Sequence, residues 1–515
     1  MGNRDAWAGS RVSGVAGRRA GLDCGMRFAI VAPALLLVAS TAAAQPRVPS
    51  PVAAQPVTSA VDVGPSRAQL QWQRMEMNAF VHFGPNAFTG AEWGSGREQP
   101  SIFNPKELDA RQWVKAFKSA GMKGVVVTAK HHDGFCLWPT KESTHTVAAS
   151  PWRGGKGDLL RELSDAARAE GLKFGVYLSP WDRNHPDYGT PKYNDVFVRM
   201  LEDVLANYGE IFEVWFDGAN GEGPNGKRQV YDWPRFHEVV RRLQPNAVIF
   251  SDAGPGIRWI GNERGEAPLT NWAMLDRDRY EPGTGLSMDL PEGSELGKFY
   301  VPGECDVSIR PGWFWRAAEN ARVKSPRTLL RLYEASVGRN CTLLLNVPPD
   351  DRGLVHENDV KALAGMRALV DAVYGSSLVP TGAKATASSS RASHGPAALL
   401  DTDLDSYWAP SVKQASATVD LGAPVTFDRV RLQEYLANGQ RVALFEIEAY
   451  ANGAWTRIAT GTTIGHTRVV ATNVTTASQV RVRIHDSRGL PMLASISLHD
   501  SSRANAVAPP DAAAH

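Results

Sequence analysis

The sequence predicts an α/β protein, a (β/α)8-like TIM barrel followed by an all-β sandwich. Between residues 66 and 370, apolar strands alternate with amphipathic helices that end at glycine, a pattern typical of a parallel sheet. From residue 371 to residue 500, short alternating segments are separated by Gly, Asn, Asp and Thr turns, which is typical of a sandwich. A chain of 515 residues with 43% hydrophobic side chains is long enough to bury both cores.

The first 65 residues are expected to lie outside both domains. Residues 1–44 form an N-terminal extension and signal peptide, in which translation starts at Met26 and a basic residue precedes a short apolar run and small residues. A transmembrane anchor is the alternative, but the run is short and contains Pro33, so we expect export to the periplasm or outside the cell, without a stable membrane anchor after cleavage. Residues 45–65, rich in Pro, Ala and Val, are expected to be a linker.

The expected barrel elements follow one another in regular order, although the second half shows fewer clear repeats. Apolar runs predict strands at 77–83, 125–127, 174–178, 211–216, 247–250, 299–301 and 342–346. Helical spacing predicts helices at 108–120, from Asp158 to Gly171, from about 197 to 208, at 234–243 and at 328–337.

Polar or aromatic residues stand where these strands end. They are His82, His131 with His132 and Asp133, Ser179 with Trp181 and Asp182, Asp217, Asp252 and Glu304. In a barrel enzyme the carboxyl ends of the strands meet at one rim and build the active site. The repetition therefore favours an active site over the alternative that Asp217, followed by a glycine, only caps a turn.

The pattern at this rim favours glycoside hydrolysis, which needs one carboxylate as nucleophile and a second carboxyl group as proton donor. Asp217 is the candidate nucleophile. The second group lies in the segment 258–266 or at Glu304, and spacing alone does not choose between them. Adjacent side chains on an extended segment point to opposite sides, so His131 and His132 favour hydrogen bonding to a hydroxylated substrate over joint metal binding.

Composition excludes several other classes. A formal charge of +2 without a basic stripe does not suggest nucleic-acid binding, and no glycine-rich phosphate loop or serine nucleophile elbow is present. Cys136, Cys305 and Cys341 of the expected mature chain lack metal-ligand spacing and are too few for a disulfide framework, so they are expected to be buried thiols. The tail, 501–515, is rich in Ala and Pro and is expected to be disordered.

Several motifs resemble those of the α-L-fucosidases of glycoside hydrolase family 29, over roughly residues 66–370. They are Asn78 to Gly84, Glu92 to Gly94, Lys130 to Phe135, Val214 to Gly218, Gly261 to Glu263, Asp306 to Trp315 and Asn340 to Pro349. The resemblance implies an exo-acting, retaining enzyme, with Asp217 as nucleophile and Glu263 as acid/base, Glu266 remaining its competitor. The substrate-binding residues that it implies are His82, Glu92, Trp93, His131, His132, Tyr177, Arg258, Trp313 and Trp315.

The resemblance extends to the branch of the family that cleaves α-1,3/1,4-linked fucose from branched glycans. A fucosylated oligosaccharide or glycoconjugate is then the substrate, and no cofactor is required for catalysis. Two alternatives stay open: a glycosidase for a fucose-like sugar such as L-galactose, and a glycan-binding protein without catalysis.

The segment from Leu400 to Trp408 and the run Val419 to Gly422 resemble a discoidin-like (coagulation factor 5/8 type C) module, here expected over 371–500. Such modules often bind galactose-like sugars. Asp401, Asp403 and Asp405 are candidate oxygen ligands for a structural Ca²⁺. The alternative is a polar loop without an ion, in a sandwich that only supports the barrel.

Overall fold

The computed structural model describes residues 63–283 and 290–507. The expected signal peptide, the start at Met26, residues 45–62 of the linker and the end of the tail lie outside the described residues. Disorder was expected from residue 501, but Ser501–Arg503 form a 3₁₀ helix (η8) and Ala504–Val507 form α9. The reason is burial, because Ala504 packs into the main hydrophobic core.

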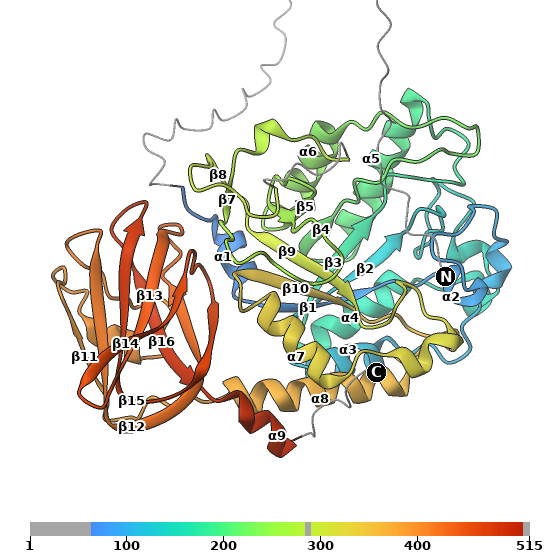
Figure 1. Ribbon diagram of the computed structural model, residues 1–515. Helices are drawn as coiled ribbons and strands as arrows, with labels where there is room; N and C mark the ends of the chain where they lie inside the picture. The colour runs from blue at the N-terminus through green and yellow to red at the C-terminus, as the bar shows by residue number, and fades with distance from the viewer. Residues whose placement is uncertain (1–62, 284–289, 508–515) are drawn as a thin grey trace, which may run out of the picture. The chain divides into compact units, whose positions relative to one another are not determined.

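Eight parallel strands close into a barrel, which confirms the predicted fold class (Figure 1). In order around the barrel they are β1 (Met77–Val81), β10 (Cys341–Asn346), β9 (Gly303–Ser308), β6 (Ile257–Trp259), β5 (Val248–Ser251), β4 (Ile211–Trp215), β3 (Lys173–Leu178) and β2 (Gly124–Lys130). Seven of the eight strands are buried at nearly every position, because helices cover the outside and side chains fill the inside.

The helices of the barrel domain begin where the sequence supplies caps. Asp109, Asp158 and Asp232 each accept a hydrogen bond from a first-turn backbone N–H. The helices are α1 (Arg67–Gln73), α2 (Asn86–Thr89), α3 (Ala110–Ser119), α4 (Leu159–Glu170), α5 (Pro191–Asn207), α6 (Trp233–Leu243), α7 (Pro326–Ala335) and α8 (Glu357–Tyr374). Short 3₁₀ helices lie at η2 (Pro100–Ile102), η3 (Val147–Ala149), η4 (Trp152–Gly155), η5 (Arg277–Arg279) and η6 (Ala317–Arg322).

The barrel departs from a regular strand-helix repeat between β5 and β9. The described residues there contain no α-helix, and a two-stranded antiparallel pair, β7 (Met274–Leu275) with β8 (Phe299–Tyr300), lies outside the barrel. The run 299–301, predicted as a strand of the sheet, is this β8. The barrel strands β6 and β9 were not predicted.

The inner face of the barrel is layered along the strand axis. Every second residue of β4 points inward, which places Glu213 lowest, Trp215 in the middle and Asp217 just beyond the strand end. An apolar layer containing Phe80, Trp215 and Phe250 packs in the centre. The polar residues beyond this layer are therefore held on a closely packed floor.

The C-terminal part is a six-stranded antiparallel sheet, as predicted from the alternation. Its strands are β11 (Lys384–Ala387), β12 (Ala415–Glu434), β13 (Val442–Ala451), β14 (Ala454–Gly461), β15 (Arg468–Ser487) and β16 (Leu493–His499), with η7 (Pro396–Leu400) before β12. The long strands β12 and β15 change register twice, which bends them around a core that contains Trp408, Phe427 and Phe445.

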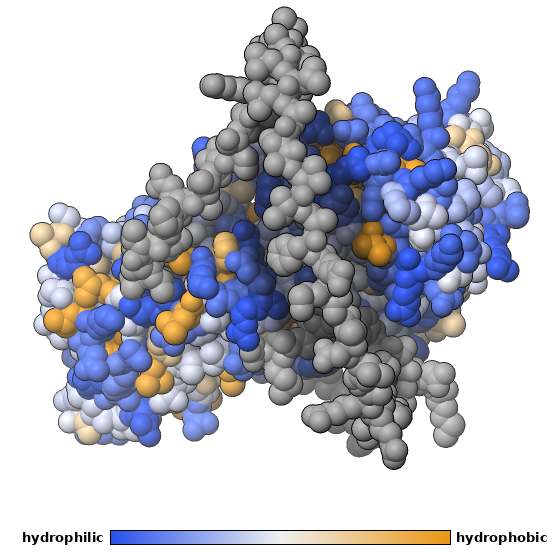
Figure 2. Space-filling model, turned by 90° about the horizontal axis from the view of Figure 1, so that it is seen from above, coloured by the Kyte–Doolittle hydropathy of each residue, from blue (hydrophilic) through white to orange (hydrophobic). Residues whose placement is uncertain are grey.

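The visible described surface is largely hydrophilic, with scattered hydrophobic residues (Figure 2). Trp93, 47% exposed, is the largest of the exposed apolar side chains in the described part of the chain. Among the described helices, none combines the length and the apolar character needed to cross a membrane.

Candidate active site

Asp217 lies just beyond the carboxyl end of β4, with both carboxylate oxygens fixed. Oδ1 accepts a hydrogen bond from the backbone N–H of Ala219 at 2.7 Å, and Oδ2 accepts one from the Tyr177 hydroxyl at 3.0 Å. Burial raises the pKa of Asp217, while these two donors lower it. The side chain keeps 24% of its surface exposed, so an oriented carboxylate faces a space that a substrate can enter.

Three histidines lie around this carboxylate in neutral form. Burial lowers the pKa of His82 and of His132 to about 3, and that of His131 well below its usual range. Asn346 fixes the tautomer of His82. The amide nitrogen of Asn346 donates to two other acceptors, so its oxygen faces His82 and accepts the Nδ1–H at 2.9 Å. His82 Nε2 is left as an acceptor for a substrate hydroxyl.

His132 is fixed in the same way through Ser179. The hydroxyl of Ser179 donates to the carbonyl of Trp181 at 2.9 Å, so its oxygen accepts from His132 Nδ1 at 2.8 Å. His132 Nε2 then lies 3.7 Å from Asp217 Oδ2. His131 stacks on Tyr177 with ring centroids 5.6 Å apart, and its Nδ1 has no partner among the described residues.

Trp313 connects the second carboxylate to the rest of the rim. Its indole Nε1–H donates to Glu263 Oε2 at 3.3 Å, and its backbone N–H donates to Glu92 Oε1 at 2.6 Å. Its ring lies 5.0 Å from that of His82. Partial burial raises the pKa of Glu263, and the negative charges of Asp217 and Glu92 raise it further. Glu263 is therefore suited to carry a proton, while the two hydrogen-bond donors on Asp217 favour its ionised form.

Glu92 is held on its other side by Arg316, whose guanidinium bonds Oε2. Burial raises the pKa of Glu92 as well. Trp93 projects from the same segment, with its ring edge toward His132 and Trp181 at 6.1 Å from each. Gly94 follows with a φ of +63°, and a side chain there would collide with Asn86 and Asp133, which explains the glycine in this motif.

The structure thus brings seven of the predicted binding residues to one rim with Asp217 and Glu263. They are His82, Glu92, Trp93, His131, His132, Tyr177 and Trp313. It places others elsewhere. Glu266 is exposed and pairs with Arg264 at 3.7 Å. Trp315 is buried and donates its indole N–H to Asn320 at 3.1 Å.

Arg258 and Glu304 also lie away from this rim. Arg258 is fully buried on the outer face of β6, where its guanidinium bonds the carbonyls of Leu290, Val301 and Pro291 and the side chain of Asn271. Glu304, expected at a strand end, lies inside β9 in the barrel interior, where it accepts the indole N–H of Trp215 at 3.0 Å. The two positions differ from expectation because the sequence did not reveal β6 and β9.

Two acids and an amide complete the rim, and of these only Asp252 was expected at a strand end. Asp306, inward on β9, accepts the Trp259 indole N–H at 2.7 Å, and burial together with the charge of Glu263 raises its pKa well above the usual range. Asp252 accepts the backbone N–H of Gly283 at 2.6 Å, and burial raises its pKa to about 6. Asn346 was only part of a motif. A polar residue at every second position of β9 was the signal for Asp306.

The proposed calcium ligands form a loop that supplies its own hydrogen bonds. Asp401 and Asp403 each accept a backbone N–H two residues ahead, at 2.9 Å, and both oxygens of Asp405 accept from the guanidinium of Arg74. A guanidinium on Asp405 competes with a cation, so the arrangement fits Ca²⁺ poorly. Within the described ranges, no group of three or more His, Cys, Asp or Glu side chains is placed to hold a metal.

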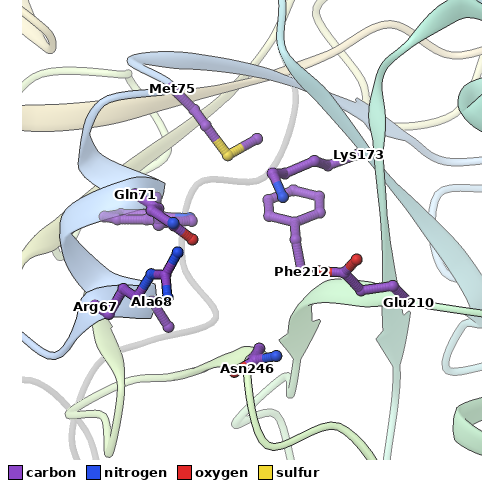
Figure 3. Close-up of a pocket in the computed structure, with 9 residues that line it drawn as sticks. Arg67, Ala68, Gln71, Met75, Lys173, Glu210, Phe212 and Asn246 are labelled. Atoms are coloured by element: carbon purple, nitrogen blue, oxygen red, sulfur yellow. The ribbon is translucent and has the colours of Figure 1, made fainter.

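A cavity of about 340 Å³ lies at the opposite end of the barrel, beneath α1 (Figure 3). Arg67, Gln71, Lys173, Glu210 and Asn246 line it, and the last three of these lie at the amino ends of barrel strands or just before them. Catalytic residues of TIM barrels come from the carboxyl ends. This cavity is therefore separate from the Asp217 site.

Comparisons with known proteins agree with this geometry. The alpha-L-fucosidase family model matches residues 56–373, and the F5/8 type C domain model matches residues 384–496. The chain is 42% identical to alpha-L-fucosidase 1 of Arabidopsis thaliana over 445 residues, which are 84% of this chain and 87% of that protein.

Solved structures are similar as well. A fucosidase of glycoside hydrolase family 29 from Ruminococcus gnavus, in complex with fucose, is 34% identical with a TM-score of 0.80, and the match covers 86% of this chain and 96% of that one. A glycoside hydrolase 29 family member from an unknown rumen bacterium is 40% identical with a TM-score of 0.76, covering 85% and 78%.

Proposed function

The chain belongs to the alpha-L-fucosidase family of glycoside hydrolases, and from this premise we propose that Asp217 and Glu263 carry out a retaining double displacement on a terminal α-L-fucoside. The observation that carries the proposal is the fixed carboxylate of Asp217, held by Tyr177 and Ala219. Glu263 supports it, because burial and the charge of Asp217 both raise the pKa of Glu263. Glycosidases of this family are independent of cofactors.

In the first step, Asp217 Oδ attacks the anomeric carbon as the bond to the leaving oxygen breaks. Glu263 gives its proton to that oxygen, and a β-linked fucosyl-enzyme forms. In the second step, Glu263, now ionised, takes a proton from a water molecule whose oxygen attacks the same carbon. Asp217 leaves as a carboxylate, so the product keeps the α configuration and both residues return to their starting states.

Rescue with azide tests the two roles separately, because the anomer of the product reveals which group is missing. With Glu263→Ala, azide intercepts the fucosyl-enzyme and gives the α-fucosyl azide. With Asp217→Gly, azide occupies the place of the nucleophile and gives the β-fucosyl azide. NMR of the products distinguishes them. Near-normal turnover of Asp217→Gly in the absence of azide would contradict the assignment of Asp217 as the nucleophile.

We also propose exo-action on α-1,3/1,4-linked fucose in branched glycans. Trp93, half exposed beside the catalytic group, offers an apolar face to a sugar beyond the fucose ring. Turnover of Lewis-type trisaccharides, 2-linked fucose, an aryl α-L-fucoside and an aryl α-L-galactoside should be compared. Equal rates on all the fucosides would contradict the linkage proposal, and a preference for the galactoside would favour the alternative sugar.

We propose export on the basis of residues 26–45. N-terminal sequencing of the protein from cells that produce the full chain should find a start close to Gln45. A protein found intact in the cytoplasm would contradict export without affecting the catalytic proposal.

A further inference from the structure

Two glutamates that the catalytic proposal does not use meet inside the barrel. Glu213 of β4 and Glu304 of β9 are both fully buried on its inner face. Glu213 Oε2 accepts the indole N–H of Trp72 at 2.9 Å, and Glu304 Oε2 accepts that of Trp215 at 3.0 Å. Each carboxyl group is thus held on one oxygen by a tryptophan.

The remaining oxygens point to a shared proton. Both Oε1 atoms are buried and have no hydrogen-bond partner among the described residues, and each carboxyl group acts on the pKa of the other. Two ionised carboxylates offer only acceptors and repel one another, so a buried pair of this kind is satisfied only if one group carries a proton. The groups that act most strongly on the pair are Trp72 from α1, Trp215 from β4 and Asp306 from β9, none of them a cation.

The pair is connected to the catalytic rim through one aromatic stack. Trp215, fixed by Glu304, stacks on Phe250 with ring centroids 3.9 Å apart and on Tyr177 with centroids 5.1 Å apart. The Tyr177 hydroxyl donates to Asp217. The orientation of the Trp215 ring therefore decides where the Tyr177 hydroxyl lies.

We propose that Glu213 and Glu304 hold one proton between them and, through Trp215 and Tyr177, position the carboxylate of Asp217. They are positioning residues, because both are fully buried in the barrel interior. The positioning part rests on the proposed role of Asp217, whereas the shared proton does not.

Infrared difference spectroscopy of the full chain tests the proton directly. At neutral pH we expect a protonated-carboxyl stretching band that disappears in both Glu213→Gln and Glu304→Gln. Glu76→Gln is the matched control, because the ion pair with Arg431 keeps this glutamate ionised at neutral pH and leaves it no such band to lose. Pair variants that both keep the full protonated-carboxyl absorbance of the parent, or a loss seen only in the control, would overturn the shared proton.

Kinetics test the positioning. In Glu304→Gln the amide replaces the shared proton with an N–H and keeps an oxygen for Trp215, so we expect kcat within about threefold of the parent. Glu304→Leu removes the acceptor, and we expect kcat to fall at least tenfold with KM changed less than twofold. An unchanged kcat in Glu304→Leu would overturn the proposal that the pair positions the carboxylate of Asp217.

If Glu304→Leu fails to fold, Trp215→Phe provides the same test, because it keeps an aromatic ring but lacks the N–H that Glu304 holds. We expect the same selective loss of kcat. Failure of the azide experiment on Asp217 with the infrared band present would contradict the proposed catalytic roles and leave the shared proton standing.

Discussion

Glu263 and Glu266 differ at the scale of single residues, although they lie three positions apart. Glu263 receives the Trp313 indole N–H and the electrostatic effect of Asp217, whereas Glu266 pairs with Arg264 on the exposed surface. We expect Glu263→Gln to lower kcat on natural glycans by about 10²–10⁴-fold, the usual contribution of general acid catalysis. The matched variant Glu266→Gln should retain activity within about twofold. A larger loss of kcat in Glu266→Gln than in Glu263→Gln would contradict the assignment of Glu263 as the acid/base.

The pH dependence of activity offers a second test at this scale. Because the charge of Glu92 raises the pKa of Glu263, Glu92→Gln should lower that pKa and let Glu263 lose its proton at lower pH. The basic limb of the kcat/KM profile should therefore move to lower pH. Glu92 also holds Trp313, so KM will rise, but a basic limb at the original pH would show that Glu263 does not control it.

The strands and loops as elements explain how the rim is held together. Asn346, at the end of β10, receives His82 through its oxygen and donates to Ser308 of β9 and to the carbonyl of Trp313. It thus fixes three neighbouring elements at once. We expect Asn346→Ala to lower kcat/KM by about 10–100-fold, since it releases both a binding histidine and the tryptophan on Glu263.

NMR of the His82 ring in this variant checks whether release of this histidine causes the loss of kcat/KM, because the ring should no longer be held in a single tautomer. Crystallography should show the altered positions of His82 and Trp313. The control is Asn358→Ala on α8, which removes an exposed bond to Asn320 and should leave kcat/KM unchanged.

Sequence alone predicted the barrel because most of its strands are apolar runs and its helices have aspartate caps. It missed β9, because this strand carries Glu304, Asp306 and Ser308 on the inner face and therefore lacks the apolar signal of a buried strand. It missed β6, which has three residues and includes an arginine. Glu304 was consequently expected at a strand end, whereas Arg258 and Trp315 were assigned to the substrate by the resemblance alone. Six of the seven binding positions came from motifs and Tyr177 from an aromatic strand-end position, but the hydrogen bonds that hold them depend on neighbours distant in the chain.

Buried carboxyl groups influence stability at the scale of the whole molecule. Burial raises the pKa of Glu434 from 4.5 to about 7, so the folded state keeps a proton that the unfolded chain releases above pH 4.5. The folded state then binds more protons, and the free energy of unfolding falls as pH rises from 4.5 to 7. Hydrogen bonds and ion pairing lower the pKa of Glu76 to about 2 against the effect of burial, so its contribution appears as pH rises from 2 to 4.5.

We therefore expect Glu434→Gln to reduce the fall in the free energy of unfolding between pH 4.5 and 7, by on the order of 1–3 kcal/mol. Urea unfolding at several pH values measures this free energy. Glu76→Gln is the opposing control, because it should flatten the rise below pH 4.5 and leave the higher range unchanged. An unaltered slope in the Glu434 variant would contradict the prediction.

The half-exposed indole of Trp93 makes the protein its own optical probe. Many of the other tryptophans, including Trp72, Trp113, Trp138 and Trp408, are almost fully buried and shielded from an aqueous quencher such as iodide. Emission from the mouth of the barrel can then be separated from that of the interior. A glycan that covers this ring would protect it from quenching, so docking of the sugar beyond the scissile bond could be followed by fluorescence in a catalytically silent variant.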